Sequence, residues 1–182
     1  MAVSALALET PGIANAFSIS STAVQPDGEI PTKYTCEGSS TAQERHTGDM
    51  DAGVSPPLAW QDPPPGTKAF ALVLEDEDAK GWVQWIVYDI PAATRALPEG
   101  VARTPTLPDG SKQGRNDLRN TYYQGPCPPK GDEPHRYVFT LYALNELSGL
   151  EVGERGVTKG QLMQAINPHI LGRVRLVGTY KR

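Results

Sequence analysis

Short runs of apolar residues, separated by turn-forming residues, give the chain its strongest pattern. Residues 69–74, 83–90 and 136–144 are mostly apolar and carry many β-branched and aromatic side chains, a composition typical of strands. Residues 174–180 close the chain with a run of the same kind. Residues 17–24 alternate between apolar and polar positions, which favours a half-buried strand. The pattern therefore predicts a protein built mainly from strands.

One segment near the C-terminus has the period of a helix. Thr158 is a suitable N-cap for a helix to about residue 166, and Leu162, Met163 and Ile166 then fall on one face. Pro168 ends or restarts this helix.

The remaining segments predict turns and extended chain. Residues 92–134 carry Pro, Gly, Asn and Asp at short intervals, which indicates mostly turns. Residues 55–60 are expected to be extended, because the residue before a proline is restricted to the β region. The polar stretch 39–53 is expected to be a surface loop. We therefore predict a flexible tail at 1–16 and a single domain at 17–182, with mostly antiparallel strands.

The composition limits the class of protein. A chain of 182 residues suits one domain. Its 18 glycines and 17 prolines follow no repeat, which excludes a helical bundle and a collagen. No stretch reaches the roughly 18 apolar residues that a membrane span needs. The net charge of −4 and the pI near 5.4 argue against a general nucleic-acid binder.

The N-terminus and the cysteines predict a cytoplasmic chain. The first residues lack the basic segment of a secretory signal, and their apolar run is interrupted by Ser4 and ends at Glu9. A trimmed mature chain is the alternative. Cys36 and Cys127 are too few for a disulfide framework, and without histidines they cannot complete a zinc site. In the cytosol two such thiols would be reduced.

Two polar segments at strand ends are candidates for chemistry. Asp76 and Asp78 would share one side of an extended chain, where two carboxylates could share a proton or bind a hard cation. His135 and Tyr137 would share a face at the start of a strand and could donate to a phosphate or a carboxylate. The alternative interpretation is a solvated strand end for the aspartates and a purely structural role for His135. The polar cluster 114–117 is better explained as a turn.

Several enzyme classes lack their motifs. The sequence has no Gly-x-Ser-x-Gly elbow of serine hydrolases, no Rossmann phosphate loop and no Walker loop. A hydrolase that uses Asp76 and His135 as a general base system stays open on the sequence alone.

The motifs, taken in order, resemble the phosphatidylethanolamine-binding protein family, and most closely its bacterial and archaeal Raf-kinase-inhibitor-like branch. The similarity runs from about residue 17 to residue 182. It is carried by IPTKYTCEG (30–38), SPPLAW (55–60), DEDA (76–79), WVQWIVYDIP (82–91), GRND (114–117), YQGPCPP (123–129), HRYVFTLYAL (135–144) and LVGTY (176–180).

The resemblance implies a mainly β fold, similar to a β-sandwich, with a large central antiparallel sheet and a few peripheral helices. It also implies a small anion pocket at one end of that sheet. Carried over residue by residue, the pocket of the family selects Asp76, Asp78, Pro129, His135 and Tyr137.

The chain departs from the family pattern in four places. Gln84 stands where the family usually has a pocket histidine, and it would offer a neutral amide instead. Glu77 and Lys80 replace two prolines beside the aspartates. Residues 118–119 replace a Phe-Gly pair, and the loop 39–53 is longer than usual. The first two changes touch the pocket itself.

The resemblance implies a non-enzymatic protein that binds a small anionic ligand and needs no cofactor. The ligand would be phosphate, a phosphoethanolamine-like head group or a carboxylate. Gln84, His135 and Tyr137 would hold it, and Asp76 would orient His135. The alternative is a regulator of a protein kinase or protease that recognises an acidic or phosphorylated side chain. The resemblance leaves open whether the chain is a monomer or a homodimer.

The resemblance also bears on the two cysteines. Both Cys36 and Cys127 stand at positions that are usual in this branch, and Cys127 lies in the pocket loop. The resemblance therefore makes a disulfide between them, across the end of the sheet, one expectation. Two free thiols are the alternative.

Overall fold

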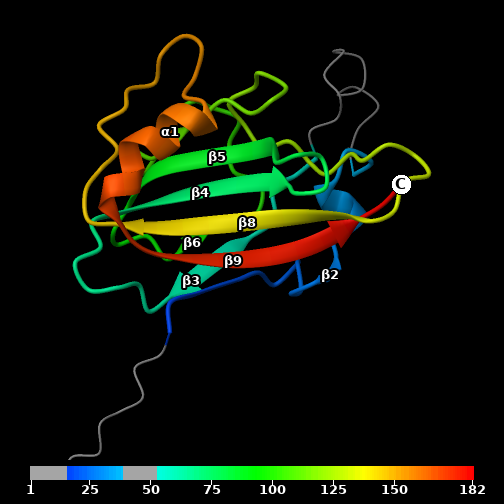
Figure 1. The fold of residues 1–182 in the computed structure, drawn as a ribbon, viewed down its shortest axis with the longest axis horizontal. Coiled ribbons are helices and arrows are strands. Elements are labelled where there is room, and N and C mark those ends of the chain that lie inside the picture. The colour runs from blue at the N-terminus through cyan, green and yellow to red at the C-terminus, as the bar shows by residue number, and fades with distance from the viewer. Residues whose placement is uncertain (1–15, 39–52) are drawn as a thin grey trace, which may run out of the picture.

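The structure, a computed structural model, describes residues 16–38 and 53–182 (Figure 1). The predicted tail at 1–16 and the predicted loop at 39–53 lie almost wholly outside the described residues, which include only the last residue of each range.

Two sheets form the body of the described chain (Figure 1). The large sheet has the order β2-β9-β8-β4-β5-β7, and all its neighbours are antiparallel except the parallel pair β2 and β9. Its strands are β2 (Gly28–Glu29), β4 (Ala69–Asp76), β5 (Trp82–Pro91), β7 (Lys112–Gln113), β8 (His135–Leu144) and β9 (Ile170–Tyr180). The small antiparallel sheet consists of β1 (Ser18–Ser20), β3 (Leu58–Gln61) and β6 (Ala96–Leu97).

The large sheet is buried on both faces, which explains the nearly continuous apolar runs of its central strands. On β4, Phe70, Leu72 and Leu74 point into a core shared with Trp60 of the small sheet. Their neighbours on the strand point the other way, into a second core. A strand with two covered faces has no alternation of polar and apolar residues. The large sheet therefore lies between two apolar layers.

The second core is covered by the helix α1 (Lys159–Ile166), which lies across the sheet (Figure 1). Leu162 and Ile166 of the helix are fully buried there, as the helical pattern predicts. Thr158 caps the helix in a reciprocal capping box with Gln161. Pro168 then lies in a 3-10 turn (Asn167–His169) that leads into β9. The mainly β fold class is confirmed, and the described helical part is this helix with two short 3-10 turns, the other at Thr32–Tyr34.

Three short strands and one strand start differ from the sequence prediction. The two-residue strands β6 and β7 fall in the segment 92–134, which predicts turns, and no strand was expected at β2. A strand of only two residues is too short to show a period of apolar and polar positions. It can therefore be recognised only by its pairing with another strand. The last strand begins at Ile170, four residues before the predicted run 174–180, because residues 170–173 pair with the end of β8.

A disulfide between Cys36 and Cys127 ties the segment after the first 3-10 turn to the loop before β8. The Cα atoms of the two cysteines are 5.4 Å apart across a sequence separation of 91 residues. The Cys36 N–H also donates to the carbonyl of Pro126 at 3.1 Å. A Cβ at Gly125 would lie 2.7 Å from the backbone of residues 34 and 35, so this close approach requires glycine.

This bond weighs against the expectation of a cytoplasmic chain with reduced thiols, because disulfides persist mainly in oxidising compartments. In the part of the chain that the structure describes, no helix is long and apolar enough to cross a membrane.

We predict that breaking the disulfide destabilises the fold. It closes a loop of about 90 residues, and the loss of such a cross-link costs about 2–5 kcal/mol of unfolding free energy in small domains. Denaturant unfolding of the oxidised and the reduced protein measures this difference.

The matched control is the double variant Cys36→Ala, Cys127→Ala. Its midpoint should equal that of the reduced protein and should not respond to reductant. Equal midpoints for the oxidised and reduced wild-type protein would show that the bond does not form or does not matter.

Candidate functional site

The turn that follows β4 is built around the buried carboxylate of Asp76. One of its oxygens, Oδ1, accepts the N–H groups of Asp78 at 3.1 Å and Ala79 at 3.0 Å. The Gly81 N–H donates to the carbonyl of Asp76 at 2.9 Å, and both Lys80 and Gly81 have positive φ. The strand therefore ends at Asp76, and the second carboxylate oxygen stays available.

That second oxygen, Oδ2, lies 2.8 Å from Nδ1 of His135, the first residue of β8. Burial by itself would lower the pKa of His135. The hydrogen bond and the charge of Asp76, together with the charges of Asp78 and Asp132, outweigh burial and raise the pKa above its usual value of 6.5. His135 therefore stays protonated to a higher pH than a free histidine.

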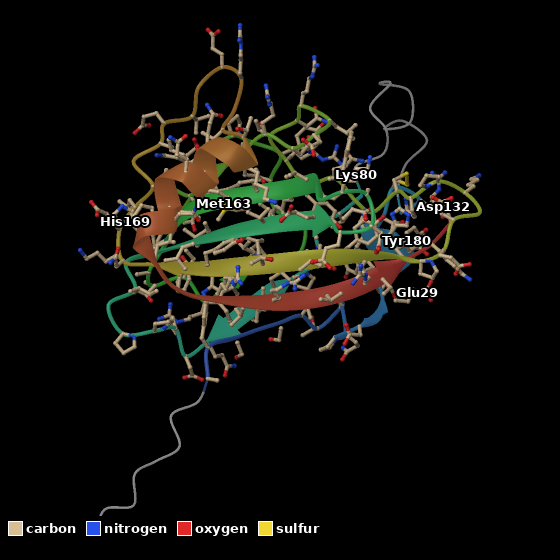
Figure 2. The ribbon with its side chains drawn as sticks, in the orientation of Figure 1. Glu29, Lys80, Asp132, Met163, His169 and Tyr180 are labelled. Carbon is tan, nitrogen blue, oxygen red and sulfur yellow. A yellow bond between two sulfur atoms is a disulfide. The ribbon has the colours of Figure 1, made fainter. Side chains whose placement is uncertain are left out.

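The other ring nitrogen of His135 faces a second carboxylate. Its Nε2 lies 3.6 Å from Asp132, whose side chain is half exposed. Figure 2 shows Asp132 at the same end of the sheet as Tyr180 and Lys80, with His169 at the opposite end. His135 is thus flanked by Asp76 on the inside and Asp132 on the outside.

Tyr137 is fully buried beside this pair. It stands directly opposite Asp76 in the pairing of β4 with β8, and its ring centroid is 6.5 Å from that of His135. Burial and then the nearby charge of Asp76 raise the pKa of Tyr137. Asp76 and the backbone of Cys127 lie close enough to influence the hydroxyl. However, no described group meets it with hydrogen-bond geometry, so this buried donor is left for another partner.

Gln84 occupies a bulge in β5. The register of β5 with β4 shifts between the pairs Leu74–Trp85 and Glu75–Val83, which leaves Gln84 as the extra residue. Its backbone carbonyl accepts the N–H of Gln124 at 3.1 Å. Its side-chain oxygen is buried without a hydrogen-bond partner among the described residues. Gln84 therefore belongs to the same end of three adjacent strands, although no hydrogen bond joins its side chain to Asp76, His135 or Tyr137.

Two further expected site residues, Asp78 and Pro129, make contacts of their own beside this group. Asp78 does not share a side with Asp76, because the chain turns after Asp76 instead of staying extended. Its carboxylate accepts from the backbone N–H of Arg136 at 2.8 Å and from the guanidinium at 3.1 and 3.0 Å. These bonds hold the pKa of Asp78 below its usual range. Pro129 is exposed, and its carbonyl accepts the N–H of Asp132 at 3.4 Å.

Glu77 and Lys80 stand where the family pattern has prolines, and hydrogen bonds, ion pairs and backbone conformation order the turn at these positions. The Glu77 N–H, which a proline would lack, donates to the carbonyl of Arg136 at 3.0 Å. The Glu77 carboxylate pairs with Arg136 and Arg175. Lys80 has a φ of 58°, which a proline cannot adopt. Hydrogen bonds and ion pairs thus order this turn without the prolines.

Sequence reasoning missed two residues near the pair. Tyr180 stands opposite His135 in the pairing of β8 with β9, and its hydroxyl donates to Glu37 at 2.6 Å. Asp132 was also missed as a neighbour of His135. The sequence offered only one hint: Tyr180 lies within a family motif and Asp132 lies beside one. Strand pairing across the sheet cannot be recognised from the residues of one strand.

The arrangement suits binding of an anion better than binding of a metal. No group of three or more His, Cys, Asp or Glu side chains that could hold a metal ion occurs among residues 16–38 and 53–182. The site offers a readily protonated imidazole and a buried phenol, which both donate hydrogen bonds.

Comparisons with known proteins show to which family the chain is similar. A sequence model described as phosphatidylethanolamine-binding protein matches residues 20–181. A UPF0098 protein of Methanothermobacter thermautotrophicus is 40% identical over 157 residues, which cover 85% of this chain and 92% of that protein.

Two solved structures share the fold. The phosphatidylethanolamine-binding protein homologue CT736 of Chlamydia trachomatis has a TM-score of 0.74 at 34% identity, covering 92% of this chain and 99% of its own. Escherichia coli YbcL, described as a member of the mammalian PEBP family, has a TM-score of 0.75 at 29% identity, covering 91% and 98%. The chain therefore belongs to the phosphatidylethanolamine-binding protein family.

Proposed function

We propose that the protein binds a small molecule with a phosphate-like or carboxylate head group and releases it unchanged. The site consists of Asp76, His135, Tyr137 and Gln84 at one end of the large sheet. The observation that carries the proposal is the 2.8 Å contact between Asp76 and His135, beside a buried Tyr137 hydroxyl without a hydrogen-bond partner among the described residues.

The Asp76–His135 contact prepares the imidazole for an anion. Nδ1–H donates to Asp76, which fixes the ring and favours its charged form. Nε2–H then points away from the buried carboxylate and donates outward. A bond from a protonated imidazole to an anion is charge-assisted and contributes about 1.5–3 kcal/mol.

The buried polar atoms argue for a ligand rather than for a purely structural cluster. A buried hydroxyl or amide that lacks a partner costs about 1–3 kcal/mol, so such groups are uncommon unless something else satisfies them. The Tyr137 hydroxyl supplies a donor. The amide of Gln84 supplies an acceptor as it stands and a donor after a half-turn about its last torsion.

The same contacts favour binding over hydrolysis. Both oxygens of Asp76 are engaged, one by two backbone N–H groups and one by His135, so Asp76 is not a free general base. The raised pKa of His135 favours its protonated form, which cannot accept a proton. Turnover assays on simple esters and phosphoesters test this part of the proposal, and measurable turnover that depends on His135 would contradict it.

A regulator of a kinase or a protease would use the same site, with the anionic group displayed on a partner protein. If the protein captures a partner protein and soluble phosphate abolishes this capture, the protein is a regulator. If it binds only free head groups, it is a small-molecule binding protein.

We predict that anion affinity falls as the pH rises through the pKa of His135, which lies above 6.5. Inorganic sulfate is the suitable probe because its charge is constant in this range. Loss of the charge-assisted bond should weaken sulfate binding by about tenfold or more between pH 6 and pH 8.5. Calorimetric titration measures this. By linkage, the same pair stabilises the fold below pH 6.5, and this contribution is lost as the pH rises through the folded-state pKa.

The matched pair of variants is His135→Gln and His169→Gln. His135→Gln should remove most of the affinity and its pH dependence. His169, at the opposite end of the sheet (Figure 2), should be replaceable without effect. A pH profile that His135→Gln leaves unchanged contradicts the proposal.

We also predict that Asp132→Asn strengthens binding. Asp132 lies 3.6 Å from Nε2 of His135, where its carboxylate competes with an incoming anion. Removing its charge should tighten sulfate binding about two- to tenfold at pH 6, because the competing contact is half exposed and screened.

Glu133→Gln is the control, since it removes the same charge one residue away. An equal gain from both variants would indicate general electrostatics rather than competition at Nε2. A loss of affinity in Asp132→Asn would mean that Asp132 supports the site through the pKa of His135.

A further inference from the structure

A cavity separate from the proposed site opens between two loops at the edge of the molecule beside β5 and α1. Its volume is about 630 Å³, and it is lined by residues of 115–122 and 154–155. Figure 1 shows these two loops, in yellow-green and orange, projecting from the same edge of the large sheet. None of Asp76, His135 and Tyr137 lines it.

Three arginines line this cavity. They are Arg115, Arg119 and Arg155, and the carboxylate of Glu154 is the one acidic side chain in the lining. The lining therefore carries an excess of positive charge in a chain whose net charge is −4. We call this cavity with its three arginines the arginine pocket.

The three arginines of the arginine pocket are unpaired, unlike several others in the molecule. Arg136 pairs with Asp78, Arg175 with Glu77 and Arg182 with Glu37. Among the described residues, no carboxylate forms an ion pair with Arg115, Arg119 or Arg155. Like charges that converge without counter-charges repel one another, and a bound anion would relieve that repulsion.

The backbone of one of these arginines is strained. Arg119 has a φ of 69°, a left-handed conformation that is unfavourable for a residue other than glycine. The side chain of Asn116 fixes this turn, because its oxygen accepts the Asn120 N–H at 2.9 Å and its amide donates to the carbonyl of Tyr122 at 3.1 Å. An arginine therefore occupies a position where glycine would be more stable, and its side chain lines the cavity.

We propose that the arginine pocket binds a small molecule with two or more adjacent phosphate groups. The planar fork of an arginine matches the oxygens of a phosphate group. Three arginines from two loops line a space larger than one phosphate needs. A volume of about 630 Å³ lies in the range of small-molecule sites. Inorganic tripolyphosphate and a nucleoside triphosphate share the required chemistry and differ only in the attached nucleoside.

Calorimetric titration of the full chain with tripolyphosphate and with ATP tests the proposal. Both should bind, with affinities that fall as salt is added, and inorganic phosphate should bind at least about tenfold more weakly because it engages fewer arginines. ATP binding much tighter than tripolyphosphate assigns a nucleotide ligand, and equal binding assigns the phosphate chain alone. Binding of neither compound at millimolar concentration, or equal binding of phosphate and tripolyphosphate, overturns the proposal.

The variants are chosen so that loss of binding and loss of folding can be distinguished. Arg155→Ala and Arg119→Gly should each weaken tripolyphosphate binding by about tenfold, the effect of one charge-assisted contact. Arg119→Gly should at the same time raise Tm by about 2–4 °C, because glycine relieves the left-handed strain. Arg173→Ala is the control, because this substitution removes the same charge from a residue that lines a different groove.

The outcomes also separate this site from the one proposed above. His135→Gln should leave tripolyphosphate binding unchanged, whereas Arg119→Gly should leave sulfate binding at His135 unchanged. A higher Tm for Arg119→Gly with unaltered tripolyphosphate affinity would remove Arg119 from the site. If Arg155→Ala and Arg173→Ala lower the tripolyphosphate affinity equally, the effect comes from the overall charge of the protein. This result would contradict the proposal.

Discussion

The carboxylate of Asp76 is the interaction on which the functional end of the molecule depends. Asp76 is the last residue of β4 and is 3% exposed, so both of its oxygens must find partners inside the protein. One oxygen closes the turn that ends the strand, and the other holds His135 at the start of β8. A single buried charge thus fixes a turn, the orientation of a histidine and the protonation of that histidine. Replacing it with an apolar side chain would remove all three effects together.

The sheet explains why the polar groups gather at its edges. Both faces of β4, β5 and β8 are covered by apolar cores, so charged side chains have room only where these strands end. At one end, the disulfide and the Tyr180–Glu37 bond hold the surrounding loops, which keeps the Asp76–His135 pair partly shielded from water. Along the edge beyond β5, the loops carry unpaired arginines around an open cavity. We propose a small anion as the ligand of the first place and a larger, more highly charged one as the ligand of the second.

The sequence predicted the long strands and the helix well, because their apolar patterns are local. The pairing of Asp76 with His135 and Tyr137 followed only from the family resemblance, since 59 residues separate Asp76 from His135. The turn after Asp76 was not predicted, because the end of β4 depends on hydrogen bonds made by Asp76, which no periodicity reveals. The bulge at Gln84 and the left-handed conformation of Arg119 have no signature in residue type, because both are imposed by neighbouring segments. Asp132 was missed for the same reason, as its role depends on where the loop before β8 folds back.

The most direct measurement of the central claim is an NMR titration of the His135 ring in the wild-type protein and in Asp76→Asn. Asparagine keeps the turn, because its side-chain oxygen also accepts backbone N–H groups, but it removes the charge beside Nδ1. The account predicts a pKa above 6.5 in the wild-type protein and a clear decrease in the variant, in which burial opposes protonation with less compensation. The same His135 pKa in both proteins would contradict the claim that Asp76 prepares this histidine to hold an anion.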